Sequence, residues 1–74
     1  MAKKKPPQWE YVSSSNLREV LYKDGNLYVK FKSGSVYLYL DVPLAIYLAL
    51  LSARSKGSYH YHHIRTSFPY RQVG

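Results

Sequence analysis

The fold is decided by residues 17–40, whose sequence is LREVLYKDGNLYVKFKSGSVYLYL. Apolar and polar residues alternate along this stretch, as they do in β-strands with one buried face. Asp24-Gly25 is the dipeptide most typical of a two-residue type I′ hairpin turn, and Ser33-Gly34 makes a second break. The stretch therefore predicts a three-stranded antiparallel meander with strands at residues 17–23, 26–32 and 35–40.

Two-residue turns fix which residues of the strands lie opposite one another. Val20 is then expected opposite Val29, and Val29 opposite Leu38. One face of the meander is expected to be apolar and to hold Val20, Tyr22, Leu27, Val29, Phe31, Val36, Leu38 and Leu40. The other face is expected to hold Leu17, Glu19, Leu21, Tyr28, Lys30, Lys32, Tyr37 and Tyr39.

A helix is predicted over residues 43–53, because Pro43 suits the first helical position. Its apolar stripe, which should cover the apolar sheet face, consists of Leu44, Tyr47, Leu48 and Leu51. Residues 58–65 are expected to be a short helix or an extended piece, and residues 68–70 to be extended. The fold class is thus α+β: a three-stranded antiparallel meander packed against one main helix, followed by a short helical or extended C-terminal segment.

The length and composition describe a small basic domain. The 74 residues contain no cysteine and carry a formal net charge of +7. Residues 1–8 read as a disordered basic arm and residues 9–74 as one domain. The main helix is apolar on nearly every side, so we expect a homo-oligomer or a second layer to cover it.

The expected location is the cytoplasm. The lysines near the N-terminus are followed by Pro6-Pro7 and not by the apolar stretch of a secretory signal. The longest apolar run, residues 44–51, is far shorter than the roughly 20 residues that cross a bilayer. No membrane partner is therefore expected.

The charges are unevenly distributed along the chain. All four acidic residues, Glu10, Glu19, Asp24 and Asp41, precede residue 53. The remainder has no acid, and its arginines and lysine are Arg54, Lys56, Arg65 and Arg71. The C-terminal third is therefore expected to face an anionic partner.

An ordered series of residues resembles the KTSC domain family. The series is Val12-x-Ser14-Ser15-Asn16-Leu17, Leu27-x-Val29-x-Phe31-Lys32-x-Gly34, Val36-Tyr37-x-Tyr39, Val42-Pro43, Ala53-x-Ser55-Lys56-Gly57-x-Tyr59 and Ile64-Arg65. Members of this family occur at the C-terminus of some lysyl-tRNA synthetases and as small separate proteins, many from bacteria, phages and other mobile elements. The resemblance implies a role related to RNA or other nucleic acid, and pattern positions at Ser15, Asn16, Ser55, Lys56, Gly57, Tyr59 and Arg65. The sequence departs from the family after Tyr59, where His60-Tyr61-His62-His63 replaces the Phe-Asn of many members.

Residues 55–59, SKGSY, are the first candidate site. Gly57 would allow the backbone to approach a ligand, and Lys56 would supply charge for a phosphate. The alternative is a helix C-cap, with Gly57 just beyond the main helix and Lys56 close to its negative end.

Five tyrosines are candidates for stacking on nucleic-acid bases: Tyr28, Tyr37, Tyr39, Tyr61 and Tyr70. The sheet tyrosines could equally be ordinary strand residues, or be covered by the C-terminal segment.

The three histidines offer little for a metal site. His60 and His62 could share one face of a strand, but no cysteine or acid follows in sequence to complete a ligand set. No metal or other cofactor is expected. Nothing in the sequence fixes a nucleophile against a base, so we expect no enzyme activity.

The sequence therefore favours a non-enzymatic module that binds RNA, single-stranded DNA or a nucleotide phosphate. The basic residues expected to contact the phosphate are Arg54, Lys56, Arg65 and Arg71, with Ser55, Gly57 and Tyr59 beside them. The alternative is a protein-interaction module, such as a phage or mobile-element accessory protein that inhibits a host factor. The apolar helix and the many tyrosines support this alternative.

Overall fold

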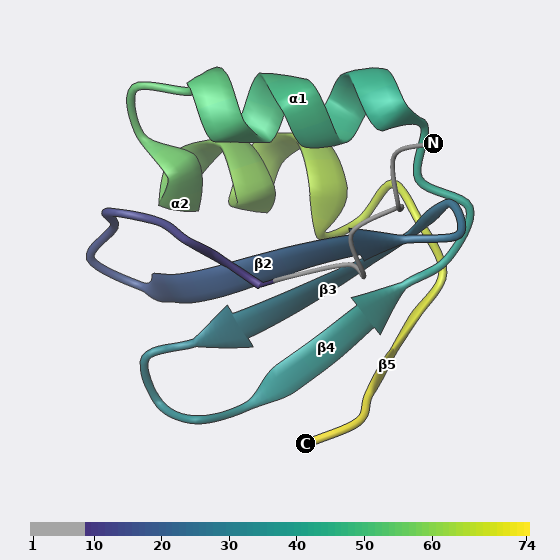
Figure 1. Cartoon of the computed structure of the whole chain (residues 1–74), viewed down its shortest axis with the longest axis horizontal. Coiled ribbons are helices and arrows are strands. Elements are labelled where there is room, and N and C mark those ends of the chain that lie inside the picture. Colours follow the sequence, from purple (N-terminus) through teal and green to yellow (C-terminus); the bar gives the residue numbers. More distant parts are fainter. Residues whose placement is uncertain (1–8) are drawn as a thin grey trace, which may run out of the picture.

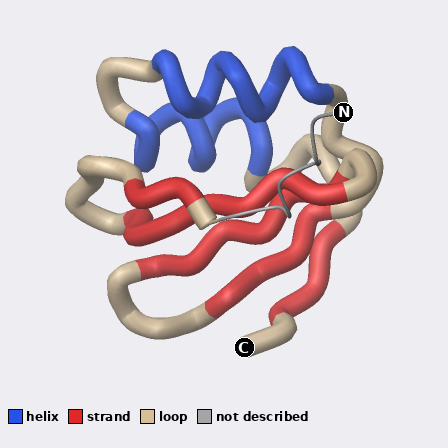
Figure 2. Tube along the Cα trace, viewed as in Figure 1, coloured by secondary structure: helices blue, strands red, loops and turns tan. Residues whose placement is uncertain are grey.

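A computed structural model describes residues 9–74 as an α+β domain (Figures 1 and 2). The predicted arm at residues 1–8 lies outside the described residues. The elements are β1 (Glu10–Tyr11), β2 (Leu17–Lys23), β3 (Asn26–Phe31), β4 (Val36–Tyr39), α1 (Leu44–Ser52), α2 (Lys56–Tyr59), η1 (His60–Ile64) and β5 (Tyr70–Gln72). The strands form one antiparallel sheet in the order β1-β2-β3-β4-β5.

The sheet has five strands where three were predicted. β1 adds to the outer edge of β2, and β5 adds to the outer edge of β4. Both added strands are short and exposed, so an alternating apolar pattern does not mark them. The C-terminal segment is both helical and extended, because α2 and η1 run on into each other and β5 follows.

The β2–β3 hairpin confirms the predicted turn. Asp24 and Gly25 have φ values of 53° and 79°, as a type I′ turn requires at both central residues. Val20 lies opposite Val29 and Tyr22 opposite Leu27. Nearer the start of β2, the pairing shifts between Leu17 and Glu19. This bulge turns Leu17 into the core, where it is fully buried, so its predicted position on the opposite face was wrong.

The predicted β3–β4 register was also wrong, by one residue. The N–H of Phe31 donates to the carbonyl of Ser35, and the N–H of Gly34 donates to the carbonyl of Phe31. The loop therefore has three residues, with Gly34 at φ 101°, the arrangement of a turn followed by a bulge. Val29 consequently lies opposite Tyr37, and Leu27 opposite Tyr39.

This change of register exchanges the faces of β4. Tyr37 and Tyr39 share the face of Leu27 and Val29, whereas Leu38 lies opposite Tyr28 on the other face. Tyr39 is 2% exposed and belongs to the core cluster. Tyr28, Tyr37 and Tyr39 therefore do not form the single tyrosine face that the sequence predicted.

The helices α1, α2 and η1 all lie on one side of the sheet (Figure 2). α1 buries Tyr47 and Leu50, and the Tyr47 ring stacks on Tyr22 at 5.0 Å. Leu44 and Leu48 are 53% and 51% exposed, so their predicted burial against the sheet was wrong. α1 also packs against α2. None of the helices among residues 9–74 combines the length and apolar character of a membrane span.

Ser55 caps the N-terminus of α2 by accepting a hydrogen bond from the N–H of Ser58. Gly57 accordingly lies inside the first turn of α2, and its alternative role as the C-cap of the main helix was wrong. The Nζ atom of Lys56 donates to the carbonyl of Ala53 at 3.0 Å, which confirms that this lysine neutralises the C-terminal end of α1.

Two glycine substitutions test this backbone description. Gly34→Ala should destabilise the protein by roughly 1 kcal/mol, because an L side chain is strained at a positive φ even with open space around it. Gly57→Ala should stabilise it by up to about 1 kcal/mol, because Gly57 is helical and an added Cβ would meet Ser14 and Asn16 at ordinary contact distances. Urea unfolding measures both free energies. A neutral Gly34→Ala variant would contradict the three-residue loop.

Candidate functional site

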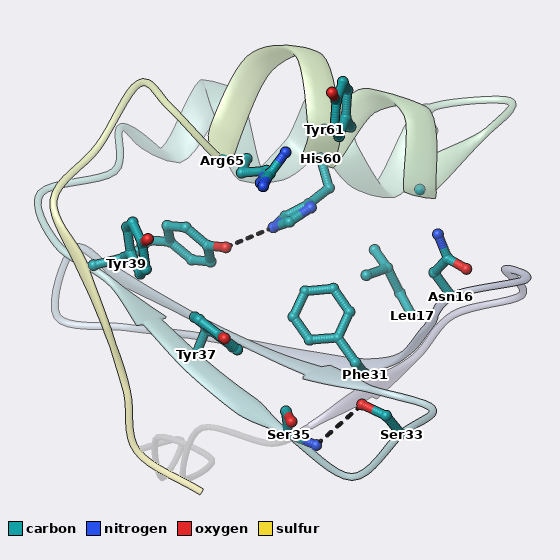
Figure 3. A pocket seen from close by; sticks show the side chains of 12 residues that line it. Asn16, Leu17, Phe31, Ser33, Ser35, Tyr37, Tyr39, His60, Tyr61 and Arg65 are labelled. Carbon is teal, nitrogen blue, oxygen red and sulfur yellow. Dashed lines mark hydrogen bonds between the residues drawn. The ribbon is translucent and has the colours of Figure 1, made fainter.

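A groove of about 470 Å³ separates the α2–η1 helix from strands β3, β4 and β5 (Figure 3). It arises because β4 and β5 extend beyond the area that the helices cover (Figure 1). Its aromatic and aliphatic lining consists of Leu17, Phe31, Tyr37, Tyr39, Tyr61 and Tyr70. Its polar lining consists of Asn16, Ser33, Ser35, Gly57, His60 and Arg65. We call this feature the aromatic groove.

Three tyrosines of β4 and β5 pack together along one wall of the aromatic groove. The ring centroid of Tyr39 lies 5.7 Å from that of Tyr70 and 6.5 Å from that of Tyr37. Tyr37 also lies 5.7 Å from Tyr70. The group exists because the three-residue loop turned Tyr37 and Tyr39 to this side and because β5 pairs with β4. Tyr70 is 56% exposed and leaves a ring face available to a ligand.

A buried hydrogen bond joins the helix to the sheet inside the groove. The hydroxyl of Tyr39 lies 2.8 Å from Nε2 of His60 (Figure 3). Burial, helped by the charge of Arg65, lowers the pKa of His60 to about 4. Burial, helped by Tyr37 and Tyr70, raises the pKa of Tyr39 to about 12. At neutral pH both groups of this hydrogen bond are therefore uncharged, and the tautomer of His60 decides which of them donates.

The position of His60 depends on a helix irregularity. Residues His60–Ile64 form a π-helical turn, closed by a hydrogen bond from the N–H of Arg65 to the carbonyl of His60. The turn buries His60 and Ile64, both on the side facing the sheet. Such turns are rare in proteins, and those that occur are often found at functional sites.

The charge of the groove is positive. Among residues 9–74, Arg65 is the only cationic residue that lines it, and no aspartate or glutamate of that range does so. The only salt bridge among residues 9–74 joins Arg18 to Glu19, so Arg65 has no acidic partner within that range. The Arg65 guanidinium instead lies 5.1 Å from the centre of the Tyr61 ring. An anionic ligand would therefore find an uncompensated arginine.

The structure gathers half of the predicted site residues. Six of them line the aromatic groove: Gly57, Arg65, Tyr37, Tyr39, Tyr61 and Tyr70. Ser55 caps the N-terminus of α2, and Lys56 donates to a carbonyl at the C-terminal end of α1. Tyr59 is partly buried against the core. Arg54 lies exposed in the turn before α2.

Two predicted site residues lie on the opposite face of the sheet. Tyr28 contacts Trp9 there, with ring centroids 6.2 Å apart, and Lys30 lies over the Trp9 ring. Arg71 pairs with Leu38 across β4 and β5 and so belongs to the same face. These residues cannot share a ligand pocket with Arg65.

The sequence did not indicate that five further residues line the groove: Leu17, Phe31, Ser33, Ser35 and His60. The four-residue spacing of His60 and Ile64 on a helix could have indicated that His60 is buried. His62 and His63 are exposed, and within residues 9–74 no three metal-ligating side chains come together.

The Tyr39–His60 pair predicts a pH dependence of stability. Unfolding returns His60 to its ordinary pKa of 6.5, so the unfolded chain binds more protons between pH 6.5 and pH 4. Stability is therefore full above pH 6.5 and falls as the pH drops toward 4, by roughly 2 kcal/mol after allowance for screening by solvent in the groove.

Urea unfolding at pH 7, 6 and 5 measures this loss in two variants. His60→Gln removes the titrating group and should flatten the dependence. His62→Gln removes an exposed imidazole and should leave the dependence unchanged. An unaltered dependence in His60→Gln would refute the assignment.

Comparison with known proteins identifies the family. Residues 13–68 match the family described as KTSC domain. A lysine–tRNA ligase from Trichormus variabilis is 45% identical over 47 residues, and one from Nostoc is 43% identical over 47 residues. Those matches cover 64% of this chain but only 8% of each ligase. The crystal structure of a KTSC domain protein from Yersinia pestis matches 93% of this chain and 100% of its own, with 33% identity and a TM-score of 0.85. This chain therefore belongs to the KTSC domain family.

Proposed function

We propose that this protein is a non-enzymatic binding module that holds single-stranded nucleic acid, RNA in particular, in the aromatic groove. The observation that carries the proposal is the combination of packed tyrosines and an unpaired arginine in one acid-free groove. Single-stranded nucleic acids are typically held by aromatic rings that stack on bases and by cations that contact phosphates. A base stacked on Tyr70 would place its phosphate within the field of Arg65, since both residues line the same groove.

The overall charge of +7 also supports the proposal. Double-stranded nucleic acid fits the groove less well, because its bases are already paired and stacked and offer no free face to Tyr70. RNA is favoured because the curated relatives are named as ligases of lysine and tRNA. Their ligase activity belongs to proteins of which this chain spans 8%.

One prediction of this proposal concerns the contact between Arg65 and phosphate. Arg65→Gln should weaken binding of a fluorescently labelled single-stranded RNA by about tenfold, the value of a lost charged hydrogen bond. It should also flatten the salt dependence of the affinity. Arg54→Gln removes the same charge from the exposed turn outside the groove and is the matched control. Fluorescence anisotropy at several salt concentrations measures both effects. Equal losses in the two variants would show that only net charge matters.

Another prediction distinguishes binding in the groove from binding on the opposite face of the sheet. Tyr70→Ala should weaken binding of the same RNA by roughly 1–3 kcal/mol, the contribution of one stacked base. Tyr28→Ala removes a tyrosine from the opposite face and should leave the affinity unchanged. If Tyr28→Ala causes the larger loss, the nucleic acid binds the Trp9 face and not the groove.

Contact with another protein is a second candidate function, favoured by the exposed Leu44 and Leu48. These residues lie one turn apart on α1, which contains no charged residue. A second copy of this chain is the first partner to test, because two chains of charge +7 can meet at an uncharged helix without local repulsion. Sedimentation equilibrium should then show a dimer that Leu44→Ser/Leu48→Ser dissociates. A single-chain mass at all concentrations would eliminate this homo-oligomer.

A further inference from the structure

We infer that Asn16 reads the base of the bound nucleotide and that the preferred base is an unpaired adenine. The inference rests on the proposed function, because it assigns an orientation to a nucleotide in the aromatic groove. It starts from the two ends of the groove, which differ in chemistry. Arg65 stands at one end and Asn16 at the other, with His60 between them (Figure 3).

The distance between the two ends suits one nucleotide. Asn16 adjoins Gly57, since a Cβ built on that glycine would lie 3.7 Å from the Asn16 amide nitrogen. Gly57 and Arg65 are eight residues apart along the continuous α2–η1 helix. This corresponds to at most roughly 12 Å at the rise of an α-helix, since η1 is π-helical. With its phosphate at Arg65, a nucleotide would cross the tyrosine wall and bring the edge of its base close to Asn16.

The backbone of Asn16 is fixed while its side chain is free. The N–H of Asn16 donates to Oγ of Ser14, and its carbonyl accepts from the N–H of Lys32. The side chain is exposed and lines the groove, and its amide has no hydrogen-bond partner among residues 9–74. It therefore presents two donors and one acceptor from a residue whose backbone is held in place.

The amide chemistry distinguishes the two purines at their N7 edge. There an asparagine amide pairs bidentately with N6 and N7 of adenine, whereas the two adjacent acceptors of guanine suit arginine or lysine. Adenine is also a purine, and its second ring extends further from the sugar than a pyrimidine does. A purine is therefore better able to span the tyrosine wall and still reach Asn16.

Short labelled oligoadenylate, oligouridylate and oligocytidylate test this inference by fluorescence anisotropy. The unmodified protein should bind oligoadenylate about tenfold more tightly than the other two, as one bidentate contact allows. Asn16→Ala should abolish this preference by weakening oligoadenylate binding alone. Ser15→Ala changes an exposed neighbour in the same loop and should keep the preference. Thermal melts confirm that both variants are folded.

The outcomes separate this inference from the proposed function. Binding of all three polymers with equal affinity, or an equal weakening of all three by Asn16→Ala, would overturn base reading by Asn16 and leave nucleic-acid binding standing. Absence of binding to any polymer at low salt would overturn the proposed function and this inference together.

Discussion

The three-residue loop at residues 32–34 determines on which side of the sheet Tyr37 and Tyr39 lie. Gly34 closes that loop at φ 101°, a backbone conformation that other residues adopt at a cost. Because side chains alternate along a strand, a loop one residue shorter would move both tyrosines to the opposite face. The aromatic groove would then lose its wall, and Leu38 would take the place of Tyr39 in the core.

The hydrogen bond between Tyr39 and His60 depends on that register and connects the two layers. It joins β4 to the π-helical turn across the groove. The Tyr39 hydroxyl and Nε2 of His60 satisfy each other at this depth. Phe31 and Tyr39 pack against the His60 ring at 5.3 and 5.4 Å, so the floor of the groove is closely packed in the absence of a ligand. A preformed floor lowers the entropy that binding must overcome.

The sequence predicts those elements whose signals are local. Asp24-Gly25 specifies the β2–β3 hairpin and its register, because both residues tolerate the positive φ of a type I′ turn. Ser33-Gly34 is ambiguous, since glycine can end either a two-residue turn or a three-residue loop. The alternation in β4 favours the wrong face, because Val36 and Leu38 are more apolar than Tyr37 and Tyr39, yet the tyrosines lie on the side of Leu27 and Val29. β5 is absent from the local pattern because Arg71 and Gln72 acquire strand structure by pairing with β4.

The candidate site was predictable in composition and not in arrangement. The acid-free C-terminal third supplies Arg65 and Tyr70, and the family resemblance marks Asn16 and Gly57. Their convergence depends on the β3–β4 register, on the bulge near Leu17 and on the π-helical turn. None of these irregularities has a periodic signature in the sequence. The error in the β3–β4 register explains why Tyr28 was grouped with Tyr37 and Tyr39. Arg71 was instead selected for its place in the acid-free C-terminal third, and its pairing with Leu38 puts it on the opposite face.

The central claim is that nucleic acid enters the aromatic groove between α2–η1 and β4–β5. The most direct measurement is the change in backbone amide chemical shifts when a single-stranded RNA is titrated into the isotopically labelled protein. We expect the largest changes at Asn16, Gly57, His60, Arg65 and Tyr70, with little change at Tyr28 or Lys30. Changes concentrated around Trp9 and Lys30 on the opposite face, with the groove residues unaffected, would contradict the account.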